Sequence, residues 1–169
     1  MKSMMGLGAS LILACSLALP LASGALAAQN LIVGTTNVGQ STVCGVPIRV
    51  EAVEYKDLMA VRSSYFVRVT PLDGKIGDEI DLNDADVNII NTAIANAPKF
   101  SKVDYKTQSG VMTVERSGLW VVARSGEASD TLVQIFFKGR ISKNCDAGSL
   151  QELRRLLLDA MSAVISMRK

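Results

Sequence analysis

The sequence predicts an α+β fold, a two-layer sandwich in which a mainly antiparallel sheet carries two helices on one face. Three observations predict it. Several strand-like runs follow one another with only short turns between them, two segments repeat apolar residues at helical spacing, and the first of these segments separates two groups of strands. Runs of adjacent strands with few helices favour antiparallel pairing, with the helices packed on one face of the sheet.

The first strands are expected between residues 29 and 70. Residues 29–46 are rich in Gly, Thr, Ser and Asn, which predicts a short strand followed by a loop. Residues 47–55, PIRVEAVEY, alternate between apolar and polar side chains and predict a strand with one face exposed to solvent. Residues 64–70, SYFVRVT, are rich in β-branched and aromatic side chains and predict another strand.

A first helix is expected at residues 84–97, where apolar residues recur at the spacing of one helix face. Asn83 or Asp84 can accept hydrogen bonds from the free amides at its start, and Pro98 ends it. Strand-like runs separated by Ser–Gly pairs then predict a meander over residues 100–141.

The last helix is expected at residues 150–167. Ser149 and Glu152 have the spacing of a capping box, in which each side chain bonds to the backbone amide of the other residue. We expect its apolar stripe to cover the domain's own sheet. The alternative is contact with a partner protein through Leu153, Leu157 and Met161. The core is expected to include Ile90, Leu157, Trp120 and either Phe136 or Phe137.

The N-terminal segment has the pattern of a secretory signal peptide. Lys2 precedes an apolar stretch, and Ala25-Leu26-Ala27 supplies small residues at the spacing of a cleavage site. Cleavage near Ala27 or Ala28 would remove residues 1–28, and an uncleaved membrane anchor is the alternative. Lipidation at Cys15 is not expected, because a bulky Leu13 precedes it where small residues are favoured.

The remaining chain is expected to be one α+β domain at residues 47–169, preceded by the strand and loop at 29–46. No second apolar segment is long enough to span a bilayer, so we expect a periplasmic or secreted protein. Two cysteines remain, Cys44 and Cys145, and an even number in an oxidising compartment predicts a disulfide. Two buried free thiols are the alternative. The numbers of basic and acidic residues are nearly equal. The composition therefore gives no indication of the basic surface that nucleic-acid binding requires.

The chain contains no histidine. This excludes Ser–His–Asp and Cys–His catalysis, histidine general bases and histidine-ligated metals. We expect a protein that is not an enzyme and that has no cofactor.

The stretch GTTNVGQST, residues 34–42, has part of the spacing of a phosphate-binding loop. Gln40 stands where that loop has its lysine, and the residues that follow do not predict the helix that such a loop opens. We therefore expect a flexible loop at the edge of the domain and no nucleotide site.

The acidic stretch at residues 73–86 is the best remaining candidate for a metal site. Carboxylates in this stretch could bind Ca²⁺, and the weak candidate set is Asp78, Asp81, Asp84 and Asp86. The spacing fails the calcium-loop pattern, so we expect a solvated loop with helix-capping acids instead.

These observations favour an exported, non-catalytic accessory or binding protein of the bacterial cell envelope, with a protein partner in assembly or secretion. A sheet edge or a sheet face would provide the binding surface. One alternative is a secreted inhibitor or immunity-type protein that blocks an enzyme through the loop at 71–79 or at 125–130. The other is a carboxylate-based hydrolase that uses Asp78, Asp81 and Asp84.

Overall fold

A computed structural model describes residues 30–75, 77–100, 111–125, 131–138 and 140–169. Two four-stranded antiparallel sheets have the strand orders β1-β2-β3-β4 and β5-β6-β7-β8. The α+β class is confirmed, and the strands form two sheets where one was expected. The first sheet consists of β1 (Asn30–Val43), β2 (Val46–Asp57), β3 (Arg62–Pro71) and β4 (Ile80–Leu82). The second consists of β5 (Val111–Arg116), β6 (Leu119–Ser125), β7 (Thr131–Phe137) and β8 (Arg140–Ile141).

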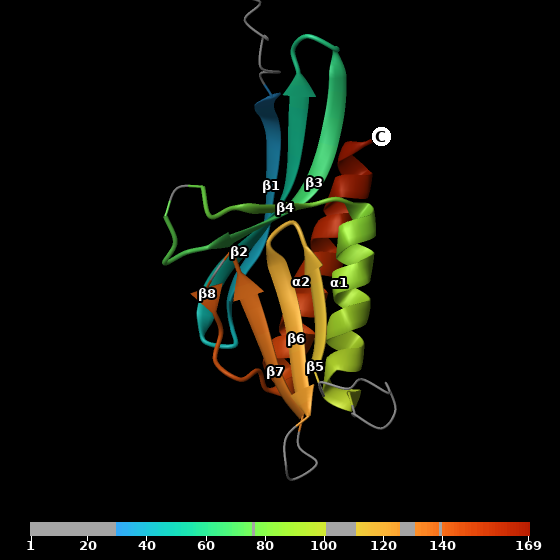
Figure 1. The fold of residues 1–169 in the computed structure, drawn as a ribbon. Coiled ribbons are helices and arrows are strands. Elements are labelled where there is room, and N and C mark those ends of the chain that lie inside the picture. The colour runs from blue at the N-terminus through green and yellow to red at the C-terminus, as the bar shows by residue number, and fades with distance from the viewer. Residues whose placement is uncertain (1–29, 76, 101–110, 126–130, 139) are drawn as a thin grey trace, which may run out of the picture.

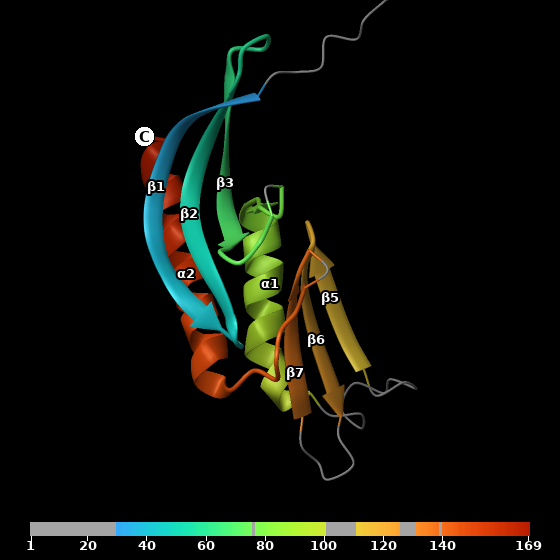
Figure 2. The ribbon, with the colours of Figure 1, turned by 90° about the vertical axis from the view of Figure 1, so that its left-hand side faces the viewer.

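Each sheet is covered on one face by a helix. Helix α2 (Ala147–Met167) packs on β1, β2 and β3, whereas α1 (Asp84–Asn96) packs on β5 and β6 and against α2 (Figures 1 and 2). The short 3-10 helix η1 (Ala97–Lys99) follows α1 and contacts β6 and β7. A single hydrophobic core includes residues from both sheets and both helices.

Strand β1 is longer than the sequence predicts. The expectation of a flexible loop at residues 34–42 is wrong, because these residues belong to β1. β1 has 14 residues and pairs with β2 along its length, with register shifts at Ile32/Gly34 and Asn37/Gly39 that mark β-bulges. A Cβ on Gly39 would lie 3.0 Å from Leu156 Cδ2 in α2. The glycines that resemble a phosphate loop therefore allow α2 to pack closely on a strongly curved strand (Figure 2).

Cys44 and Gly45 form the two-residue turn between β1 and β2. Both have positive φ, 52° and 81°, as a type I′ turn requires. Cys44 is bonded to Cys145, so the predicted disulfide is confirmed. It joins the end of the first sheet to the segment that leads into α2.

Helix α1 begins where the sequence predicts, and Asn83 caps it. The Asn83 side chain accepts from the Asp86 amide at 2.9 Å, and the Asp86 carboxylate accepts from the Asn83 amide at 3.3 Å. These reciprocal bonds form a capping box.

Helix α2 begins earlier than expected, at Ala147, and the capping box predicted at Ser149 and Glu152 is wrong. Asp146 is the N-cap, and its carboxylate accepts from the Ser149 amide at 2.7 Å. Ser149 therefore lies within the first turn, and Glu152 pairs with Arg155 at 2.7 Å instead.

Most of the predicted core is confirmed, but Trp120 is not part of it. Ile90, Leu157 and Phe137 are fully buried, whereas Trp120 is 41% exposed. Side chains alternate along a strand, and the neighbours of Trp120 in β6 face the core. Trp120 therefore lies on the outer face of the second sheet, opposite Phe136 in the strand register.

Two short strands differ from the sequence prediction. β4 pairs with β3 in a stretch expected to be a loop. The run at 131–141 expected as one strand divides into β7 and β8, and Lys138 has a φ of 43° at the turn. The signal peptide at 1–28 and most of the strand-like run at 100–106 lie outside the described residues.

Candidate functional site

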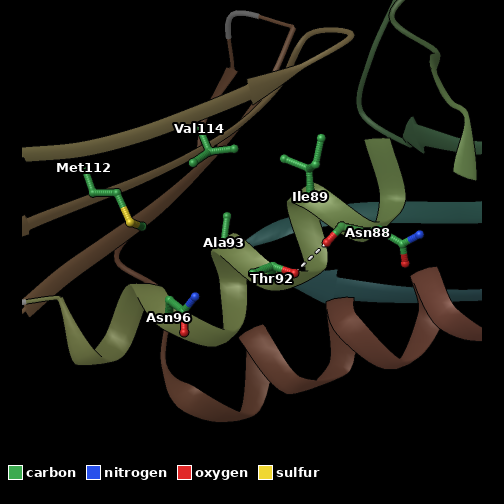
Figure 3. Close-up of a pocket in the computed structure, with 7 residues that line it drawn as sticks. All are labelled: Asn88, Ile89, Thr92, Ala93, Asn96, Met112 and Val114. Atoms are coloured by element: carbon green, nitrogen blue, oxygen red, sulfur yellow. Dashed lines mark hydrogen bonds between the residues drawn. The ribbon is translucent and has the colours of Figure 1, made fainter. Parts of the chain in front are cut away.

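A groove of about 370 Å³ lies between α1 and β5. Ile89 and Ala93 point from the helix toward Met112 and Val114 on the strand, and together they form an apolar floor (Figure 3). Asn88, Thr92 and Asn96 line the groove along the helix, one turn apart. We call this site the α1–β5 groove; its volume lies at the small end of the range for ligand pockets in proteins.

The polar residues of the α1–β5 groove carry no charge. The Thr92 hydroxyl donates to the Asn88 carbonyl at 2.8 Å, so its oxygen can still accept a hydrogen bond from a ligand. The side-chain amides of Asn88 and Asn96 each contain a donor and an acceptor. Such a lining can bond to peptide groups or to neutral polar side chains.

Strand β5 provides the other feature of the site, an edge that no other described strand pairs with. Within the described residues β5 pairs with β6 alone. Ser117 and Gly118 form a two-residue turn with positive φ, so Arg116 and Leu119 form the hydrogen-bonded pair that closes the hairpin. By alternation from this pair, the N–H of Thr113 points away from β6, toward the open edge.

Ion pairs and hydrogen bonds hold α1 beside β5. At the start of the helix, the Asp86 carboxylate lies 3.7 Å from Arg116 Nε and accepts from the Ser117 hydroxyl at 3.4 Å. On the side facing α2, Arg154 Nε donates to Asn91 Oδ1 at 2.8 Å. Both walls of the groove are therefore held in place by contacts outside its lining.

A further ion pair joins α1 to the end of α2. Arg168 donates two hydrogen bonds to Asp84, at 2.6 and 2.8 Å, and its guanidinium lies 5.5 Å from the centre of the Tyr65 ring. The hydrogen bond from Arg168 lowers the pKa of Asp84 below its ordinary value, with the arginine charge acting in the same direction. The pair is half exposed, so its contribution to stability is small.

The carboxylates proposed as a weak calcium set are not brought together. Asp78, Asp84 and Asp86 pair with three different arginines, namely Arg140, Arg168 and Arg116.

The fourth, Asp81, pairs with Arg68 at 2.8 Å and accepts from the Tyr55 hydroxyl at 2.6 Å; Arg68 also donates to Tyr55. Among the described residues no group of His, Cys, Asp and Glu is arranged to hold a metal ion. These four carboxylates instead form ion pairs that join different elements of the fold.

The other residues considered as contacts are engaged within the domain. In α2, Leu153 and Leu157 are fully buried and Met161 packs against the core, so the apolar stripe covers the domain's own sheet. In the loop at 71–79, Asp73 lies 2.6 Å from Arg140, which ties this loop to the second sheet. Of the loop at 125–130, residues 126–130 lie outside the described part of the chain.

The sequence contains a weak signal for the α1–β5 groove. Asn88, Thr92 and Asn96 recur every four residues on the expected helix, next to Ile89, which is apolar but lies off the main apolar stripe. A second apolar position outside the core stripe indicates a second contact surface. The pairing of this surface with β5 could not be read from the sequence, because it depends on how the second sheet packs against α1 in the tertiary structure.

The comparisons with known proteins do not assign a family. No family model matches the chain, and no curated protein matches its sequence. Within the described residues no helix is long and apolar enough to cross a membrane. The disulfide fits a protein that folds in an oxidising compartment.

Proposed function

We propose that this protein is an exported, non-catalytic binding protein of the bacterial cell envelope, and that its α1–β5 groove holds an extended segment of a partner protein in assembly or secretion. The observation that supports the proposal most directly is the position of an apolar groove beside the edge of β5 that pairs with no other described strand. An extended segment that pairs with such an edge gains main-chain hydrogen bonds, and the groove selects its side chains.

The groove indicates what kind of segment would bind. In a strand added to β5, alternate side chains would point toward α1 and enter the apolar floor formed by Ile89, Ala93, Met112 and Val114. Met112 is flexible and can adapt to side chains of different shape. The uncharged polar residues Asn88, Thr92 and Asn96 favour a partner segment with apolar residues at alternate positions and neutral polar groups between them.

The groove is largely formed before binding. The contacts of Asp86 with Arg116 and Ser117, and of Arg154 with Asn91, fix α1 relative to the rest of the domain. A partner would then be the main component that becomes ordered on binding, which reduces the entropy cost of association.

The geometry favours this proposal over the two alternatives. For an inhibitor acting through the loop at 71–79, the structure shows ion pairs of Asp73 and Asp78 with Arg140 inside the domain, and no pocket is described beside this loop that would favour that role. A carboxylate hydrolase would need two carboxylates facing a common substrate, whereas Asp78, Asp81 and Asp84 each pair with a different arginine.

The test is photo-cross-linking in intact cells. A photoreactive residue at Asn96, in the groove, is expected to form an adduct with one reproducible envelope or secretion protein, identified by mass spectrometry. The same residue at Ile165, exposed on α2, serves as the control and is expected to form no such adduct.

Substitution of Thr113 separates edge pairing from other contacts. Thr113→Pro removes the N–H that points to the open edge without removing a bond to β6, and proline is tolerated at such edge positions. Thr113→Val retains the N–H and is the matched control. Loss of the adduct in Thr113→Pro and its retention in Thr113→Val would support the proposal. An adduct that persists in a folded Thr113→Pro variant would contradict it.

A further inference from the structure

The end of the first sheet carries a concentration of exposed apolar side chains. They come from the β2–β3 turn and from the start of β1, and comprise Leu58, Met59, Val61, Leu31, Ile32 and Val33. The two groups lie together because Leu31 and Ile32 pair with Lys56 and Tyr55, just before the turn. We call this set the apolar tip. The hairpin projects past the end of α2, so neither of the two described α-helices covers it (Figure 1).

The turn is structured even though its side chains face solvent. The Asp57 carboxylate accepts from the amides of Met59 and Ala60, at 2.8 and 3.1 Å. Val61 has a φ of 51°, a conformation that is unfavourable for a β-branched residue. Met59 is 68% exposed and Val61 76% exposed. Turns normally use Gly, Asn or Asp at such positions, so folding alone does not explain these apolar residues.

Positive charges flank the apolar tip. Lys56 and Arg62 are exposed on either side of the turn, and neither forms an ion pair with another described residue. The acid between them, Asp57, bonds to the turn amides. The surface therefore has apolar side chains at its apex and unpaired cations behind them.

We propose that the apolar tip inserts into the interface of an anionic phospholipid membrane, with Lys56 and Arg62 at the level of the head groups. A projecting apolar apex bordered by cations suits a soft, negatively charged surface, where apolar burial and electrostatic attraction add. This arrangement leaves the α1–β5 groove free, because the groove lies on a different part of the molecule (Figure 1).

The test is co-sedimentation with vesicles, using exported protein in which removal of residues 1–28 is verified by intact mass. We expect binding to vesicles of phosphatidylcholine mixed with phosphatidylglycerol, and weak binding to phosphatidylcholine alone.

Met59→Ser/Val61→Ser is expected to lower the partition coefficient at least about tenfold, because it removes the most exposed apolar groups. Lys56→Gln and Arg62→Gln are each expected to lower it about fivefold at low salt. Ile165→Ser, which removes an exposed apolar residue on α2, is the matched control and is expected to bind like the wild type.

Fluorescence reports insertion directly. Leu58→Trp in a Trp120→Phe background places one tryptophan in the turn, and its emission is expected to shift to shorter wavelength on anionic vesicles. Circular dichroism verifies that each variant is folded.

The proposal is wrong if the wild type does not bind anionic vesicles at low salt, if Met59→Ser/Val61→Ser binds as well as the wild type, or if the emission at position 58 does not change on binding. It is also wrong if a photoreactive residue at Met59 forms an adduct with a protein while the wild type leaves vesicles unbound. Thr113→Pro is expected to bind vesicles normally, so this result is independent of the groove.

Discussion

Removal of the disulfide is expected to destabilise the protein strongly. Cys44→Ala/Cys145→Ala opens a link between residues separated by 101 positions, which constrains most of the folded domain. In the chain-entropy model a loop of this length contributes about 4.7 kcal/mol to the free energy of unfolding. Domains of this size are stable by only about 5–15 kcal/mol, so the variant loses a large share of its stability. We expect the melting temperature to fall by roughly 10–20 °C.

Urea unfolding followed by far-ultraviolet circular dichroism measures this loss. The oxidised wild type, the reduced wild type and the double variant are compared, and the last two are expected to agree. The dependence of the unfolding free energy on urea should also rise in the variant, because an unfolded chain without the cross-link exposes more surface. A loss below about 1 kcal/mol with an unchanged urea dependence would contradict this prediction, because the disulfide would then not constrain the unfolded chain.

The close packing at Gly39, the Arg168–Asp84 ion pair and the exposure of Trp120 can each be tested separately. Gly39→Ala places a Cβ 3.0 Å from Leu156 Cδ2 and is expected to cost about 1–3 kcal/mol in the free energy of unfolding, measured in urea. Arg168→Gln is expected to cost at most about 1 kcal/mol at pH 7. Since the folded-state pKa of Asp84 is lowered, the stability difference between Arg168→Gln and the wild type should be complete above the ordinary aspartate pKa. It should disappear as the pH falls through the lowered pKa. A stability difference independent of pH would contradict a role for the Arg168–Asp84 ion pair. Trp120, the chain's single tryptophan, is expected to be readily quenched by acrylamide in the native state, whereas a protected native signal would place it in the core.

The two proposals describe different parts of one molecule. The α1–β5 groove would hold an extended partner segment, and the apolar tip would hold the domain at a membrane. Because Thr113→Pro and Met59→Ser/Val61→Ser alter separate surfaces, either proposal can fail without the other.

Features that depend on neighbouring residues could be predicted from the amino-acid sequence. Helix α1 starts where Asn83 and Asp86 can cap it, and it ends before Pro98. Strands β2 and β3 cover the alternating and β-branched runs that predicted them. The disulfide was predicted from the even number of cysteines that remains after the expected removal of the signal peptide, and the structure contains it. Periodicity and capping act over a few residues, so they can be read without knowledge of the fold.

Which surfaces these elements share depends on contacts between them in the folded protein. The Gly-rich segment with Gly34 and Gly39 is a strand, because pairing with β2 and close packing under α2 outweigh its weak local strand propensity. Trp120 faces solvent because the register of β6 turns its neighbours inward. The α1–β5 groove and the apolar tip each combine side chains from different secondary-structure elements. Such surfaces depend on sheet order and register, which are set by contacts between distant residues.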